Sequence, residues 1–193
     1  MDNKGLLLEE IKKDALGDWK SIVVEVRPSA FKNEDGSLKP FYLTRSFSFL
    51  PEDQFTLEII NYADAFGKIP LVKMLIKGRM EFQGDYPIAE GAQKVDFTAD
   101  HSYEVTPLIQ NFADVLNNLA KDGFDQWEIG KSQDILKKKF LPFGLNEGDV
   151  FKEYDLIYLY KDMMFWGARN IDGRGFDTEE NRPTNLQIPM IRK

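Results

Sequence analysis

The chain has 193 residues, of which 42% are hydrophobic, and a net charge of −7. This length and composition predict one globular domain over residues 1–193 and argue against a disordered or fibrous chain. The acidic balance argues against general binding to nucleic acid or to an anionic membrane surface. Cysteine is absent, which excludes disulfides and thiolate metal ligands.

The beginning of the chain predicts no export signal. The apolar run at residues 6–8 is interrupted by Glu9 and Glu10, and no basic region precedes a long apolar stretch. No segment approaches the roughly 18 apolar residues that a membrane span needs. We therefore expect no integral membrane segment and a cytoplasmic protein, or an extracellular or periplasmic one if a signal has been removed.

The first elements are a helix and a strand. Leu7, Leu8, Ile11 and Ala15 recur at helical spacing and predict an N-terminal helix within residues 1–16. Gly17 suits its end. Alternation then predicts a strand over residues 19–27, whose buried face would carry Ile22, Val24 and Val26.

Four longer strands follow at residues 41–50, 55–62, 71–82 and 95–105. Gly78 lies inside the third of these strands on its apolar side, which is typical of a bend, a bulge or a close approach of other atoms. A bulge near Asp100 is also expected in the fourth.

A second helix is predicted at about 107–121, with Thr106 as its N-cap and Pro107 at its first position. A short strand is expected around Trp127, and residues 131–152 show no clear pattern. Residues 153–160 and 163–170 indicate a hairpin. The polar segment 171–193 is expected to form an extended C-terminal tail.

These elements predict a mainly β fold. Sequential hairpins of seven or eight antiparallel strands indicate an up-and-down meander with an N-terminal helix and one inserted helix. Closure of such a meander into a barrel would remove exposed strand edges and leave room for one small ligand.

Arg45 is the most informative candidate for a binding site. Alternation over residues 41–49 places it on the same face as Leu43 and Phe47. A lone buried charge costs several kcal/mol, so a guanidinium at this position needs a partner. Arg45 would bind a ligand carboxylate or phosphate, or would form an internal ion pair with Asp64, Glu58 or Glu153.

The other candidate ligand-binding residues are the inward-facing side chains of the predicted strands. They are either a filled core or the wall of a pocket, and the sequence leaves both open. This set consists of Phe47, Phe49, Phe55, Leu57, Met74, Ile76, Met80, Phe82, Phe97, His101 and Tyr103.

Catalytic candidates are few. His101 is the single histidine, and a proton-transfer role beside Tyr103 and Glu58 is the alternative to a structural position in the core or at the rim. One histidine without cysteine predicts no metal site. Residues 172–175 match neither the P-loop nor the dinucleotide pattern, so no cofactor is expected.

The order Gly17-Asp18-Trp19 after a short helix resembles the beginning of lipocalin-like barrels. That resemblance implies that Trp19 closes one end of the barrel and that Arg169 stacks on it as a structural partner. The wider pattern resembles the repeated domain of the adenomatosis polyposis coli down-regulated 1 family of Wnt inhibitors. The matching pieces are Glu25-Val26-Arg27-Pro28, Leu43-Thr44-Arg45, Tyr62-Ala63-Asp64, Gly78-Arg79, Val105-Thr106-Pro107, Glu153-Tyr154, Arg182-Pro183 and Gln187-Ile188-Pro189, with Trp127, Gly167 and Arg169.

The family resemblance implies a lipocalin-like barrel that holds the lipid of a lipid-modified protein. This chain has one such domain and no cysteines where the family has disulfides. The expected function is therefore binding of a small apolar ligand, such as a fatty acid or lipid, in a barrel cavity; whether a protein partner exists is unknown from the sequence. The alternatives are a lipocalin-like enzyme, a cyclase or isomerase, acting on a hydrophobic small molecule, and an interaction module with a filled barrel.

Overall fold

A computed structural model describes residues 3–193 of the chain. The helices are α1 (Asn3–Ala15) and α2 (Gln110–Leu119), and two short 3-10 turns cover Leu141–Phe143 and Glu179–Asn181. The strands are β1 (Gly17–Ser21), β2 (Glu25–Lys32), β3 (Leu38–Leu50), β4 (Gln54–Tyr62), β5 (Pro70–Asp85), β6 (Gln93–Pro107), β7 (Gln133–Asp134), β8 (Lys152–Tyr160), β9 (Met163–Trp166) and β10 (Met190–Arg192). The expected N-terminal helix is confirmed from residue 3; residues 1 and 2 lie outside the described part.

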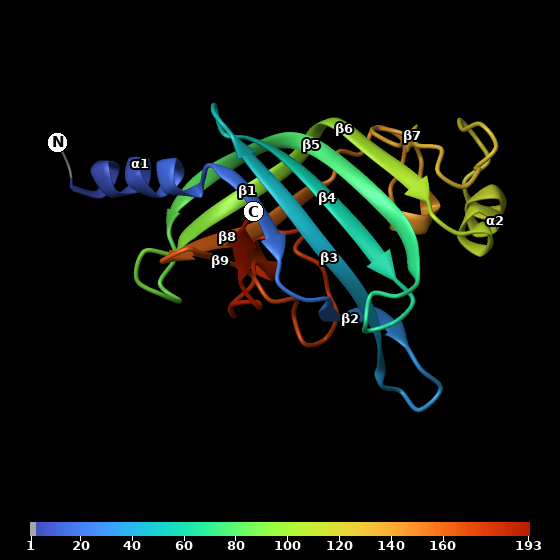
Figure 1. The fold of residues 1–193 in the computed structure, drawn as a ribbon, viewed down its shortest axis with the longest axis horizontal. Coiled ribbons are helices and arrows are strands. Elements are labelled where there is room, and N and C mark those ends of the chain that lie inside the picture. The colour runs from blue at the N-terminus through green and yellow to red at the C-terminus, as the bar shows by residue number, and fades with distance from the viewer. Residues whose placement is uncertain (1–2) are drawn as a thin grey trace.

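The strands of residues 3–193 form one ten-stranded antiparallel sheet that closes into a ring (Figure 1). The order β1-β10-β9-β8-β6-β5-β4-β3 returns to its start because β1 also pairs with β3. β2 pairs with the other half of β3, and β7 pairs with β6. The sheet is up-and-down, as the alternating sequence predicts. In Figure 1, α1 projects from one side of the ring, and α2 lies at the opposite side.

The segment predicted as one strand over residues 19–27 is two strands, and its inward face is the opposite of the one expected. Trp19, Glu25 and Arg27 are buried, whereas Ile22 and Val26 are exposed. All three buried residues are at odd-numbered positions, so Glu25 and Arg27 lie on the same inward-facing side as Trp19. The outer face of this segment is the more apolar one, so alternation of polarity predicts the wrong face to be buried.

The inserted helix begins later than expected. Thr106 and Pro107 do not start it, because they end β6, where Pro107 pairs with Val72 of β5. The helix N-cap is Ile109. The predicted strand around Trp127 is absent, and the indole is instead buried in a loop, where it donates a hydrogen bond to the Ala120 carbonyl.

Residues 124–151 cover one end of the ring. Phe124 and Trp127 pack on Phe140, and Phe143 and Phe151 each contact the buried ring of Tyr103. The Ala99 amide donates to the Phe151 carbonyl. The segment that showed no clear pattern in the sequence therefore contributes aromatic side chains to the core.

The C-terminal segment is not simply an extended tail. Buried Arg182 donates to the carbonyls of Val95 and Asp155 and forms an ion pair with Asp96 at 2.6 Å. β10 then pairs with both β1 and β9. The last strand thus completes the ring that the meander begins.

At Gly78 the backbone of β6 lies close against β5. The pairing of the two strands shifts register there, opposite residues 98–102, which confirms the expected bulge near Asp100. A Cβ at Gly78 would lie 1.9 Å from the Thr98 carbonyl oxygen, so no side chain fits.

Candidate functional site

Glu25 is the partner of Arg45 inside the ring. Arg45 Nε donates to Glu25 Oε1 at 2.9 Å, and Arg27 Nη2 donates to Oε2 at 2.8 Å. Ser21 and Gln187 donate to the same carboxylate. Burial alone would raise the pKa of Glu25, but the two guanidinium groups lower it to about 2. The carboxylate therefore stays ionised and fixes both arginines.

The expected partners of Arg45 were wrong. Asp64 accepts backbone hydrogen bonds from Phe66, Lys68 and Ile69 in its own loop. Glu58 is paired along β4 with Ser46 and Leu75, on the outer face of the sheet. No hydrogen bond or ion pair joins Glu153 to Arg45 among the described residues, although its charge acts on the same cluster.

Two buried hydrogen-bond donors inside the ring have no acceptor among residues 3–193. One is Arg45 Nη2 and the other is Trp166 Nε1; the two residues are only 6% and 1% exposed. The guanidinium carbon of Arg45 lies 5.3 Å from the centre of the Trp166 ring. Such donors are costly when they are buried without an acceptor.

Two carboxyl groups face these donors from β8. Glu153 is paired across the sheet with Phe97, and Asp155 with Val95, so both lie on the inner face. Asp155 accepts hydrogen bonds from the amides of Leu156 and Gly167. Burial raises the pKa of Glu153, against the charges of Arg27, Arg45 and Arg169. Burial, with Glu153 as a second cause, raises the pKa of Asp155 to about 7.

A small cavity of about 20 Å³ lies inside the ring next to these groups. Nine residues line it: Phe47, Phe55, Leu57, Ile76, Phe97, Ala99, Phe151, Glu153 and Trp166. Glu153 is the one charged group among them. This volume holds about one water molecule. Side chains fill the rest of the lumen. The largest contribution is the stacked pair of Phe47 and Trp166, whose ring centres lie 4.1 Å apart.

The structure brings most of the predicted lining residues into the ring. Phe47, Phe55, Leu57, Ile76 and Phe97 line the cavity, while Phe49, Met74 and Tyr103 are buried beside it. The remaining ones lie elsewhere. Met80 is buried but also borders a groove outside the ring, and Phe82 is partly buried beneath the ammonium group of Lys12.

The catalytic candidates are not brought together. His101 lies at the bulge of β6 with 49% of its side chain exposed, so the expectation that it lies on the apolar face was wrong. Glu58 is on the outer face, and the buried Tyr103 hydroxyl contacts Met74 Sδ at 3.7 Å. Burial raises the pKa of Tyr103 further above its usual value.

Trp19 has a cationic partner, but it is not Arg169. The guanidinium carbon of Arg192 lies 4.3 Å from the centre of the Trp19 ring, and Trp19 Nε1 donates to the Ala15 carbonyl. Arg169 instead lies over Phe41 and donates to the Gly173 carbonyl. Both arginines are structural contacts at different places in the ring.

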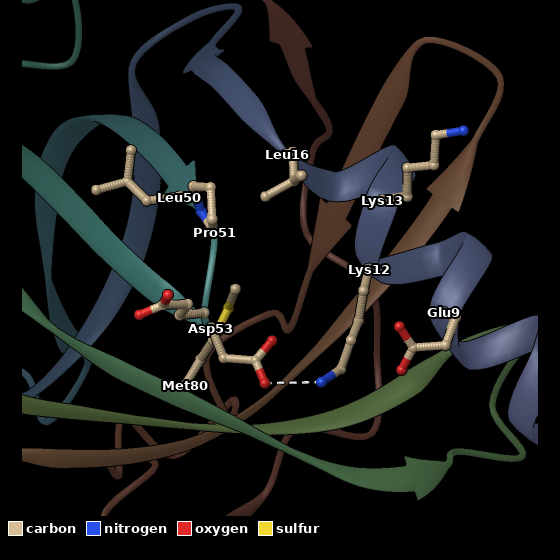
Figure 2. Close-up of a pocket in the computed structure, with 9 residues that line it drawn as sticks. Glu9, Lys12, Lys13, Leu16, Leu50, Pro51, Asp53 and Met80 are labelled. Carbon is tan, nitrogen blue, oxygen red and sulfur yellow. Dashed lines mark hydrogen bonds and ion pairs between the residues drawn. The ribbon is translucent and has the colours of Figure 1, made fainter.

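A larger hollow of about 340 Å³ lies outside the ring, between α1 and the β3–β4 turn (Figure 2). Lys12 crosses it to Asp53 at 2.7 Å, and Glu9 and Lys13 add further charges. This groove is open, and Lys12 and Asp53 already pair with each other across it. Arg45 Nη2 and Trp166 Nε1, two of the buried polar groups without partners among the described residues, lie instead inside the ring.

Four site residues were missed by the sequence analysis as cavity lining: Ala99, Phe151, Glu153 and Trp166. Trp166 shares a strand face with Met164 on β9, and Glu153 shares one with Asp155 on β8. The period-two pattern of these strands could therefore have placed both residues on the inner face. Phe151 precedes its strand and had no local signal. It reaches the lumen through the loop that covers the ring.

No protein-family model matches the chain. Over residues 3–193, no helix has the length and apolar character that a bilayer span requires. In the same range, no three histidine or acidic side chains form a group that would hold a metal ion.

Proposed function

We propose that this protein binds a small apolar molecule, such as a fatty acid or related lipid, inside the ring, which we take to be a lipocalin-like barrel. The observation that carries the proposal is Arg45, a charged side chain held among aromatic rings next to an apolar cavity. A guanidinium with one nitrogen unpartnered is a costly feature for a core that serves only stability. In a binding site the same feature orients a ligand.

Burial of an apolar chain would supply most of the affinity, at about 0.8 kcal/mol for each methylene group. Because the cavity of about 20 Å³ is far smaller than such a molecule, binding requires side chains to move. Phe151 is the residue best placed to do so. It lines the cavity, is only partly buried, and belongs to the loop segment that covers the ring.

The proposal is tested by native mass spectrometry of the purified protein together with titration by a fluorescent fatty acid. We expect a stoichiometric complex with a dissociation constant in the micromolar range or below. Absence of bound or competing lipid at micromolar concentration would reject the proposal. A Phe151→Ala variant should bind more rapidly, because it removes a ring that occupies part of the lumen.

The filled lumen supports a second candidate function, an interaction module that binds another protein through its outer surface. Phe31, Phe66 and Ile171 are large apolar side chains that are 76%, 81% and 92% exposed. This candidate predicts no lipid binding, together with loss of a protein complex when Phe66 or Ile171 is replaced by Ser. The fatty-acid titration therefore separates the two functions.

A further inference from the structure

We propose that the lumen recognises a carboxylate head group, held between Arg45 Nη2 and Trp166 Nε1, and that Glu153 takes up one proton from solvent when the anion binds. This inference rests on the proposed function and specifies the chemistry of its ligand. It is carried by the two buried donors without acceptors and by the charged residue that lines the cavity.

The two donors define what the ligand must present. Arg45 uses Nε for Glu25 and leaves Nη2 free of any acceptor within residues 3–193. The indole of Trp166 lines the cavity, and its Nε1 also lacks an acceptor there. Two N–H donors close to one cavity suit the two oxygens of a carboxylate. A phosphate dianion would place more charge and more acceptors there than two donors satisfy.

Above about pH 7, where Asp155 is ionised, the charges inside this part of the ring are balanced. Arg27, Arg45 and Arg169 face three carboxyl groups, those of Glu25, Glu153 and Asp155. The other titratable group close to Glu153 is the Tyr103 hydroxyl on β6. A ligand carboxylate would add a fourth negative charge in a buried site, which is unfavourable unless one acid becomes neutral.

Glu153 is the acid that meets this requirement. Glu25 accepts hydrogen bonds from four side chains, two of them arginines that keep it ionised, and Asp155 accepts two backbone hydrogen bonds. Glu153 has no such bond among the described residues and borders the cavity. Burial already raises its pKa, which lowers the cost of protonating it when an anion binds beside it. Carboxylate binding should therefore weaken as the pH rises.

The test compares two ligands of equal chain length, dodecanoate and dodecan-1-ol, by displacement of a fluorescent probe at about pH 6 and about pH 8. We expect dodecanoate to bind about tenfold more tightly than the alcohol at the lower pH, the difference made by one charge-assisted hydrogen bond. Its affinity should fall by up to about tenfold per pH unit, whereas that of the alcohol should not change. Calorimetry in buffers of different ionisation enthalpy should count one proton taken up.

Two variants and one control complete the test. Trp166→Phe keeps an aromatic ring but removes the N–H, so it should weaken dodecanoate several-fold more than it changes binding of the alcohol. Glu153→Gln should bind dodecanoate without pH dependence. Trp127→Phe is the matched control, because its Nε1 is satisfied by Ala120 and it does not line the cavity.

Each result decides between the two proposals. If neither ligand binds, the proposed function fails. If both bind with equal affinity, or if Trp166→Phe weakens both equally, the function stands and the carboxylate site is refuted. A preference for dodecanoate without proton uptake would refute the role of Glu153.

Discussion

Arg192 lies over the indole of Trp19, with its guanidinium carbon 4.3 Å from the ring centre, and so joins the last strand to the first. The same guanidinium donates to the carbonyls of Asp14 and Leu16 at the end of α1. One exposed side chain therefore connects the helix, β1 and β10.

Replacing Arg192 by Gln should lower the free energy of unfolding by about 1 kcal/mol, because it removes a cation–π contact and hydrogen bonds at an exposed site. Urea denaturation measures the change. Arg174→Gln is the matched control, since Arg174 forms only an exposed contact with Asp172 in its own loop. Equal effects of the two substitutions would show that the Trp19 contact is not stabilising.

Glu25→Gln should be among the most destabilising single substitutions in the ring. It leaves Arg27 and Arg45 buried without their shared carboxylate, and breaking a buried ion pair from one side costs about 3–5 kcal/mol. Thermal or chemical denaturation tests this. Asp172→Asn, which breaks an exposed pair, should change stability by less than about 1 kcal/mol. A similar small change for Glu25→Gln would mean that the arginines find other partners.

Gly78→Ala tests the close approach of β5 to β6. Its Cβ would overlap the Thr98 carbonyl, so the strands must separate, and we expect a loss of about 2–4 kcal/mol. Gly84→Ala in the same strand has open space around its Cβ but a φ of +101°, and should lose about 1–2 kcal/mol. The order of these two effects distinguishes packing from backbone strain. The reverse order would contradict the close approach.

Asp155 should make the protein less stable as the pH rises. Its pKa is raised to about 7 in the folded state, above the ordinary value of 3.8. Between these two values the folded chain binds more protons than the unfolded chain, so the free energy of unfolding falls with rising pH, by at most about 1.4 kcal/mol per pH unit. Glu25, with its pKa lowered to about 2, acts in the opposite direction, and its contribution is lost only below about pH 4.5.

The measurement is urea denaturation of Asp155→Asn and of the unsubstituted protein across this pH window. The amide oxygen can keep accepting from Leu156 and Gly167, so the variant should fold and should show a flatter pH dependence. Asp122→Asn, at an exposed position, should leave the profile unchanged. Identical profiles for all three proteins would show that Asp155 titrates normally.

The inward faces of β3, β4 and β5 could be predicted from the sequence because their two faces differ clearly in polarity. Phe47, Leu57 and Ile76 alternate with polar residues, and each faces the lumen. The same reasoning failed for β2, whose outer face is the apolar one. There the burial of Glu25 depends on Arg45, which lies far along the chain, so no local pattern reveals it.

Local sequence patterns also could not predict where α2 starts or how the ring closes. Thr106 and Pro107 suit the beginning of a helix, but pairing with β5 keeps them extended. β10 is only three residues long, too short for its alternation to be recognised. Its pairing partners are set by the closed shape of the sheet. Tertiary contacts decided both cases.

The seam between β1 and β10 has a consequence for how the molecule reaches its native state. Every other neighbouring pair in the ring except β1 with β3, β6 with β8 and β9 with β10 joins strands that follow closely in sequence, whereas this pair unites the two ends of the described chain. Contacts of such long range form late, since loop-closure entropy opposes them. Until they form, β1 and β9 each present a free edge to other molecules. Refolding at high protein concentration should therefore yield strand-exchanged dimers, and refolding at low protein concentration should suppress them.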